Sequence, residues 1–142
     1  MRTVQTHSPE ETWALAAELA NELPPGTVIA LHGDLGAGKT CFIQGFAAAL
    51  GIDEPITSPT YTIIGEYEGR LPLHHIDLYR LSGPEEALGL GLEEYFDANG
   101  ITAIEWAERA EGLLPTDLLH IRIEVDEDSG MRTFSLFREN EA

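Results

Sequence analysis

The sequence predicts an α/β domain in which helices surround a mixed β-sheet. Three observations indicate this class. Short apolar runs typical of buried strands, at 27–32 and 101–106, alternate with helical segments. Strand-like runs later in the chain are joined by short turns, which predicts antiparallel hairpins. The chain has 142 residues, the size of one hydrophobic core, so we assign residues 1–142 to a single domain.

The first third of the chain is expected to form a helix, a strand and a second helix. Ser8, Pro9 and Glu11 make a helix start with a capping box, and the helix is expected over 8–23. Its apolar face is predicted from residues at helical spacing, namely Trp13, Ala16, Ala17, Ala20 and Leu23. After the strand at 27–32, a glycine-rich turn at 33–38 leads into a helix over about 39–50, which Gly51 closes.

The rest of the chain reads mainly as strands. They are expected at 2–6 (an edge strand), 60–67, 71–77, 101–106, 118–125 and 131–138. The turns at 68–70 and 126–130 predict two hairpins. Residues 84–96 are predicted to be helical, with interruptions at Gly89 and Gly91.

Charge limits the partners of this chain. Eight basic and 25 acidic residues give a formal net charge of −17, which argues against direct binding to nucleic-acid phosphates or anionic membranes. Adaptation of the source to salt, or a GC-rich genome, is an alternative origin of the acidity. One cysteine, Cys41, excludes an internal disulfide. The N-terminal residues lack the apolar segment of a signal peptide, and no run of about 18 apolar residues occurs, so we expect a cytoplasmic protein.

Residues 33–40, GDLGAGKT, match the phosphate-binding pattern G-x-x-x-x-G-K-[ST] in full. Such a loop turns backbone N–H groups towards a polyphosphate, and the positive end of the following helix faces the same anion. Lys39, the only lysine of the chain, is expected to contact the β- and γ-phosphates, and the Thr40 hydroxyl to bind Mg²⁺. The candidate nucleotide contacts are Gly33, Asp34, Leu35, Gly36, Ala37, Gly38, Lys39, Thr40 and Cys41. Cys41 by itself reads as a small core residue facing the sheet.

Acidic residues follow two of the predicted strands. Glu105 ends the apolar run at 101–106, the usual place of a Walker-B-type carboxylate that faces Mg²⁺. Asp77 ends the strand at 71–77, where it is expected to hold the attacking water or a Mg²⁺-bound water. Trp106 is expected either to line this site or to fill the core. His74 and His75 are expected to face opposite sides of their strand without a metal-binding role.

Several features remain open or argue against other nucleotide-binding classes. The stretch 57–60, TSPT, is interpreted either as a γ-phosphate-sensing switch or as a capped turn. No lysine remains for the guanine-reading motif of Ras-like GTPases. Arg109, Arg122, Arg132 and Arg138 are scattered along the chain, unlike the arginine-rich lid of small-molecule kinases. We therefore expect slow hydrolysis that rises when a partner completes the site, with Arg80 as a candidate arginine finger.

Taken together, the motifs GDLGAGKT, TSPTYTII, HHIDLYR and IEWAER resemble the TsaE (YjeE) family over about residues 8–138. These bacterial ATPases are needed to make threonylcarbamoyladenosine at position 37 of tRNAs that read codons starting with A. The resemblance implies a P-loop NTPase-like fold with helices on both faces of the sheet. It also implies ATP and Mg²⁺ as cofactors and TsaD with TsaB as partners, tRNA being bound only through them.

The resemblance also assigns roles to residues of this sequence. It makes Lys39 and Asp77 the catalytic pair, makes Thr40 and Glu105 the Mg²⁺ ligands, and makes 57–60 a switch. Glu11 and Thr12 would lie near the adenine. Two other functions stay open: a small P-loop kinase, and a protein that binds partners under ATP control without significant turnover.

Overall fold

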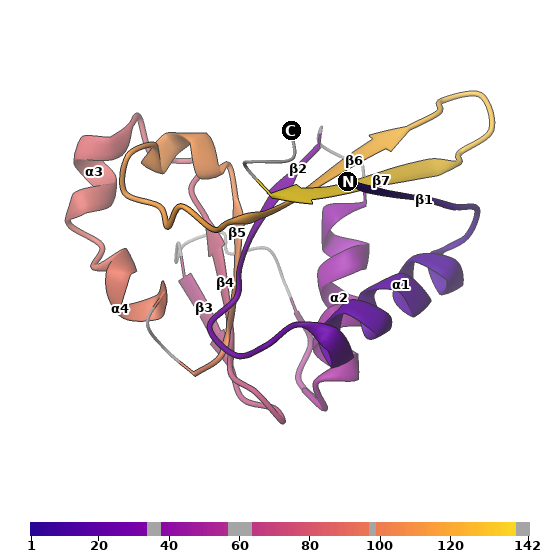
Figure 1. Cartoon of the computed structure of the whole chain (residues 1–142), viewed down its shortest axis with the longest axis horizontal. Helices are drawn as coiled ribbons and strands as arrows, with labels where there is room; N and C mark the ends of the chain where they lie inside the picture. Colours follow the sequence, from indigo (N-terminus) through magenta and orange to yellow (C-terminus); the bar gives the residue numbers. More distant parts are fainter. Residues whose placement is uncertain (34–37, 57–63, 97–98, 139–142) are drawn as a thin grey trace.

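A computed structural model describes residues 1–33, 38–56, 64–96 and 99–138 (Figure 1). Within this part, the strands are β1 (Arg2–Thr6), β2 (Val28–His32), β3 (Ile64–Tyr67), β4 (Leu73–Asp77), β5 (Ile101–Glu105), β6 (Leu119–Val125) and β7 (Arg132–Arg138). The helices are α1 (Pro9–Glu22), α2 (Lys39–Ala49), α3 (Pro84–Leu88) and α4 (Leu92–Phe96), with a 3₁₀ turn, η1 (Ala107–Ala110).

The strands form one mixed sheet in the order β1-β7-β6-β2-β5-β4-β3. β2 pairs in parallel with β5 and β6, and β4 pairs in parallel with β5. β3 with β4 and β6 with β7 are the two predicted antiparallel hairpins, and β1 is the predicted edge strand beside β7. The carboxyl ends of β2, β4, β5 and β6 therefore lie at the same edge of the sheet.

Helices cover both faces of the sheet, as predicted. α1 and α2 pack side by side on one face over an apolar cluster that includes Phe42, Phe46 and Phe134 (Figure 1). On the other face, α3, α4 and η1 contribute to a second cluster around Ile76 and Ile104. Four of the five residues of β2 are buried, because alternate side chains enter the two clusters. This double burial fixes the strand that leads into Gly33.

The predicted start of α1 is confirmed, with one difference. The Ser8 side chain accepts the backbone N–H of Glu11 at 3.2 Å. The Glu11 carboxylate in turn accepts the backbone N–H of His7 at 2.8 Å, one residue before the usual partner in a capping box. The boundaries of α2 are also confirmed, and Gly51 takes the left-handed φ of +81° that ends it.

The apolar face predicted for α1 is partly wrong. The buried residues are Thr12, Leu15, Ala16, Leu19 and Ala20, so the buried stripe starts one residue before the predicted one. Trp13 is 42% exposed and lies at the contact between α1 and α2. A Cβ built on Gly45 of α2 would lie 2.8 Å from Trp13 Cδ1, so the two helices approach closely at this point and Trp13 packs against Gly45.

The helical region at 84–96 divides as predicted. α3 ends at Leu88, α4 starts at Leu92, and Gly91 between them has a left-handed φ of +67°. Residues 60–63 of the strand predicted at 60–67 lie outside the described residues. Along the described chain, we find no helix with the length and apolar character needed to span a bilayer.

Candidate functional site

Three of the predicted site residues come from the ends of three elements at one edge of the sheet. Lys39 begins α2, Glu105 ends β5 and Asp77 ends β4. Asp77 and Glu105 are register partners on adjacent parallel strands, so their side chains leave the sheet on the same face. That face carries α2, and the topology thus gathers one cation and two carboxylates that are far apart in the sequence.

Lys39 and Glu105 form an ion pair that is almost completely buried. Lys39 Nζ lies 3.5 Å from Glu105 Oε1, and the two side chains are 9% and 6% exposed. A buried carboxylate is costly unless it is paired. The pairing shows why an acidic residue is stable at the end of a strand whose five residues are all buried.

The second oxygen of Glu105 is held by His75, a contact that the sequence analysis missed. His75 Nε2 donates a hydrogen bond to Glu105 Oε2 at 2.7 Å. Burial alone would raise the pKa of Glu105, but the hydrogen bond and charge of His75, followed by Lys39, outweigh it and leave the pKa below its usual range. Glu105 is therefore an ionised carboxylate at neutral pH.

His74 and His75 face opposite sides of β4, as predicted. His74 packs against the ring of Tyr95 at 5.0 Å, while His75 turns towards Glu105. Because side chains alternate along a strand, the sequence could have predicted that His75 lies on the same face as Asp77. What the sequence does not reveal is that β5 lies beside β4 in this register.

Asp77 is half-buried and shapes the turn after β4. Its Oδ1 accepts the backbone N–H of Tyr79 at 3.0 Å. This local contact fixes the orientation of the carboxylate at the strand end. Its expected role towards an attacking water stays a prediction.

Trp106 forms a wall of the site in an unusual backbone conformation. Its φ and ψ of 60° and 42° are left-handed, the only such non-glycine residue in the described chain. Lys39 Nζ lies 5.2 Å from the centre of the indole, and the Arg109 guanidinium lies 5.5 Å from it.

Arg109 also donates hydrogen bonds to the carbonyl oxygens of Tyr79 and Leu81, and so connects the turn after β4 to η1. Of the two expectations for Trp106, lining the cavity is confirmed, and the half-buried ring also packs against the second core cluster without being part of it.

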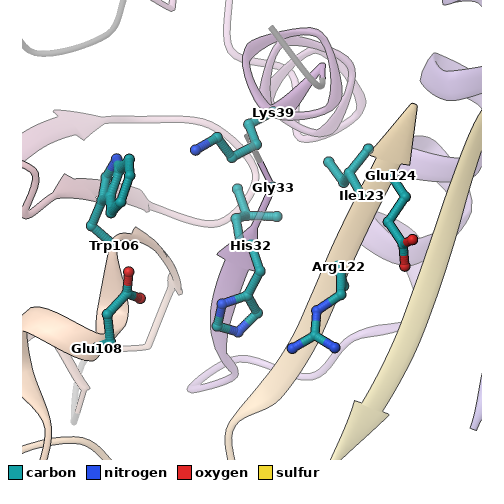
Figure 2. Close-up of a pocket in the computed structure, with 9 residues that line it drawn as sticks. His32, Gly33, Lys39, Trp106, Glu108, Arg122, Ile123 and Glu124 are labelled. Atoms are coloured by element: carbon teal, nitrogen blue, oxygen red, sulfur yellow. The ribbon is translucent and has the colours of Figure 1, made fainter. Parts of the chain in front are cut away.

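A cavity of about 320 Å³ opens beside this wall. Figure 2 shows Lys39 at the start of α2, Trp106 on one side and Arg122 of β6 on the other, with His32 between them. The residues that line it are Leu31, His32, Gly33, Lys39, Trp106, Glu108, Arg122, Ile123 and Glu124. Gly33 and Lys39 were predicted site residues, whereas His32, Glu108 and Arg122 were not.

His32 belongs to a stack of rings on the face of the sheet opposite to α2. Its Nε2 lies 2.9 Å from His120 Nδ1, and the His120 ring stacks on both His32 and Phe137. Burial, followed by the neighbouring His120 and Arg122, holds the pKa of His32 below its usual value. His32 is therefore neutral at pH 7.

The arginines that are scattered in the sequence converge in the fold. Arg109 lies over Trp106, and Arg122 lines the cavity. Arg132 passes so close to Gly38 that a Cβ there would lie 2.7 Å from the arginine Nε. Strand ends that meet at one edge bring these residues together. The fourth of these arginines, Arg138, lies away from the site. It donates a hydrogen bond to the carbonyl oxygen of Asp117.

The remaining predicted site residues occupy different environments. Gly38 precedes α2 with a left-handed φ of +104°, and Thr40 is exposed at the helix start. Cys41 is half-buried and belongs to neither apolar cluster, so its expected place in the core is wrong, because Phe42 and Ile43 fill that position. The loop residues Asp34, Leu35, Gly36 and Ala37 and the stretch 57–60 lie outside the described residues.

Glu11 and Thr12 do not line the cavity. Thr12 is buried, and its hydroxyl lies 2.9 Å from the hydroxyl of Thr6. Glu11 caps the start of α1. Their expected proximity to an adenine remains a prediction.

Comparison with known proteins gives a consistent result. The family model of the threonylcarbamoyl adenosine biosynthesis protein TsaE matches residues 6–134. The tRNA threonylcarbamoyladenosine biosynthesis protein TsaE of Bacillus subtilis is 50% identical over 120 residues, which cover 84% of this chain and 75% of that protein. The protein of the same name from Treponema pallidum is 42% identical over 125 residues, or 88% and 92% of the two chains.

A solved structure agrees with the fold. The crystal structure of Bacillus subtilis YdiB matches with a TM-score of 0.79 and 43% identity, covering 95% of this chain and 83% of that one. The predicted α/β, P-loop NTPase-like class is confirmed.

Proposed function

Because this chain belongs to the TsaE family, we propose that it binds and hydrolyses Mg·ATP as an accessory protein in the threonylcarbamoyladenosine modification of tRNA. The observation that supports the proposal best is the buried contact between Lys39 and Glu105 beside the cavity. A lysine next to a carboxylate is the combination that a site for Mg²⁺ and a polyphosphate would use. The positions of the two residues, at the start of α2 and at the end of the neighbouring strand β5, support this proposal.

The donor groups fit the proposed cofactors. Mg²⁺ prefers oxygen ligands, and the Thr40 hydroxyl and the Glu105 carboxylate are of this kind. The His75 contact leaves Glu105 Oε1 on the side of Lys39. The cavity of about 320 Å³ next to Gly33 and Lys39 offers room for a polyphosphate.

Different residues of the chain would have different roles in phosphoryl transfer to water. Lys39 would exchange Glu105 for the β- and γ-phosphates and so balance their negative charge. Mg²⁺, when bound by Thr40 and Glu105, would supply further neutralisation of charge on the phosphates. Asp77, held by the Tyr79 N–H, would orient the attacking water. Trp106 would shield the reacting phosphate from bulk water.

The net charge of the chain and its family support a proposal about its protein partners. With a net charge of −17, this chain is poorly suited to hold tRNA itself. We propose that it acts in the cytoplasm on a complex of TsaD and TsaB, which binds the tRNA and carries out the transfer. ATP hydrolysis by this chain would reset that complex between turnovers.

Phosphate release from Mg·ATP, with and without purified TsaD and TsaB, tests the proposal. We expect a slow basal rate that rises when both partners are present, and no rate above background for Lys39→Ala. Arg2→Ala is the matched control, because it removes a cation from an exposed ion pair with Glu18. A rate that ignores the partners would contradict the accessory role. Transfer of phosphate to an added acceptor would indicate a kinase instead.

A further inference from the structure

His75 occupies a place in the structure that core packing alone does not require. It is 1% exposed and lies in the middle of β4, two residues before Asp77. Nε2 donates to Glu105, while Nδ1 has no hydrogen-bond partner in the part of the chain that the structure describes. An imidazole buried with one nitrogen unpartnered costs free energy, and an apolar side chain of similar size would avoid that cost. The contact to Glu105 is what distinguishes His75 from such an apolar residue.

The contact to Glu105 fixes a torsion that is otherwise soft. The terminal torsion of a glutamate side chain is broad and roughly two-fold, so an unrestrained carboxylate samples many orientations. Here the hydrogen bond of 2.7 Å from His75 holds Oε2 of Glu105 against β4. Oε1 is consequently presented on the other side, 3.5 Å from Lys39 at the start of α2.

We propose that His75 is a positioning residue that orients the Glu105 carboxylate for Mg²⁺. Its Nε2–H group holds Oε2, so that Oε1 faces the start of α2, the helix that carries Thr40. This inference rests on the proposed function, because it presupposes that Glu105 serves a nucleotide-bound metal ion. Carboxylates that bind metals are commonly oriented by such a hydrogen bond, and losing it typically weakens metal binding about 10- to 100-fold.

His74 provides a matched control on the same strand. It points to the opposite face from Glu105, where its ring contacts Tyr95 and its Nδ1 lies 3.8 Å from the exposed Glu66 carboxylate. A substitution at His74 therefore also changes a largely buried histidine of β4, without touching the proposed metal ligand.

The test measures metal binding rather than turnover. The protein of 142 residues, in excess over a non-hydrolysable ATP analogue so that the analogue is bound, is titrated with Mn²⁺ in place of Mg²⁺, and free Mn²⁺ is followed by electron paramagnetic resonance. Analogue binding is measured separately in EDTA. The variants are His75→Asn, His75→Leu, His75→Gln, His74→Asn and Glu105→Gln. The Gln amide nitrogen takes nearly the place of Nε2, whereas the shorter Asn amide takes that of Nδ1 and does not reach Glu105.

We expect His75→Asn and His75→Leu to weaken Mn²⁺ binding about 10- to 100-fold, with analogue affinity in EDTA unchanged within about twofold. His75→Gln and His74→Asn should stay close to the unsubstituted protein. A purely structural role for His75 would lower the thermal midpoint but would not separate the metal-dependent from the metal-independent affinity. Two loss variants are included so that a folding failure in one leaves the other to decide.

Two results would overturn the inference. In the first, Glu105→Gln loses Mn²⁺ affinity while a folded His75→Asn or His75→Leu keeps it. In the second, His75→Gln is as weak as His75→Asn, because the hydrogen bond would then not be the cause. Failure of the proposed function looks different, since Glu105→Gln would then bind Mn²⁺ like the unsubstituted protein, or the analogue would not bind at all.

Discussion

The Nζ atom of Lys39 lies 3.5 Å from Oε1 of Glu105, and this single contact joins the first residue of α2 to the last residue of β5. Ion pairs buried to this degree contribute little net stability, because the desolvation of both charges offsets their attraction. The pair is thus better explained by the site than by the fold. Glu105 holds the ammonium group of Lys39, which lines the cavity, and under the proposed function a phosphate would replace this carboxylate.

Replacing this cation should separate binding from folding. We expect Lys39→Met to weaken ATP binding by at least about 100-fold, equivalent to about 3 kcal/mol. The free energy of unfolding should fall by only about 1–3 kcal/mol, since His75 still partners Glu105. Titration calorimetry and urea denaturation measure the two effects. Arg2→Met, on an exposed ion pair, should change neither by much, and retained ATP binding in Lys39→Met would disprove the assignment.

The left-handed backbone of Trp106 predicts that glycine is more stable than alanine at this position, the reverse of the usual order in a helix. Trp106→Gly and Trp106→Ala both remove the ring, but only the alanine variant keeps the steric cost of a φ near +60°. We expect Trp106→Gly to be more stable than Trp106→Ala by about 1 kcal/mol in urea denaturation. Ala14→Gly on the exposed side of α1 should show the opposite sign. Equal stability of the two Trp106 variants would argue against the observed conformation.

The lowered pKa of His32 predicts a loss of stability in mild acid. The unfolded chain takes up a proton on this histidine below about pH 6.5, while folded His32 resists protonation. Its contribution is therefore fully present above pH 6.5 and is lost as the pH falls from there through the folded pKa. Relative to His32→Gln, the unsubstituted protein should lose no more than about 1.4 kcal/mol between pH 7.5 and pH 5.5. Denaturant titrations at each pH measure this difference.

A matched substitution checks that the effect belongs to His32. His7→Gln removes an exposed histidine that follows directly after β1. The pH dependence of its stability should follow that of the unsubstituted protein. If His32→Gln shows the same pH dependence as well, burial of the His32 ring is not the cause.

The buried hydroxyl pair of Thr6 and Thr12 predicts strong non-additivity. Either Thr6→Val or Thr12→Val leaves one buried hydroxyl without its partner and should cost about 1–2 kcal/mol. The double variant should recover most of that loss, because both polar groups are gone. Urea denaturation of all four proteins measures the coupling.

The same four proteins address the predicted adenine contact of Thr12. ATP affinity that stays low in the double variant, after stability has recovered, would support that contact. Affinity that recovers together with stability would show that Thr12 acts only through the start of α1.

The sequence by itself determined most of the elements and marked one candidate site. Local signals set the boundaries of α1 and α2, and apolar alternation located the strands, including β1 at the edge. The pattern at 33–40 and the acids after β4 and β5 marked Lys39, Asp77 and Glu105 as site residues. The predictions of the elements succeed because capping and periodicity act within a few neighbouring residues, while the roles of the site residues stay predictions.

Only the tertiary structure decided which residues meet. The order of the strands places β5 between β2 and β4, and so brings His75 to Glu105 across 30 positions of sequence. It also gathers Arg109, Arg122 and Arg132 around the cavity and the loop, although they are scattered along the chain. The buried side of α1 differs by one residue from the predicted one, and Trp13 lies against Gly45 of α2. Contacts between distant segments depend on strand order, register and helix packing, and no local pattern in the sequence encodes these.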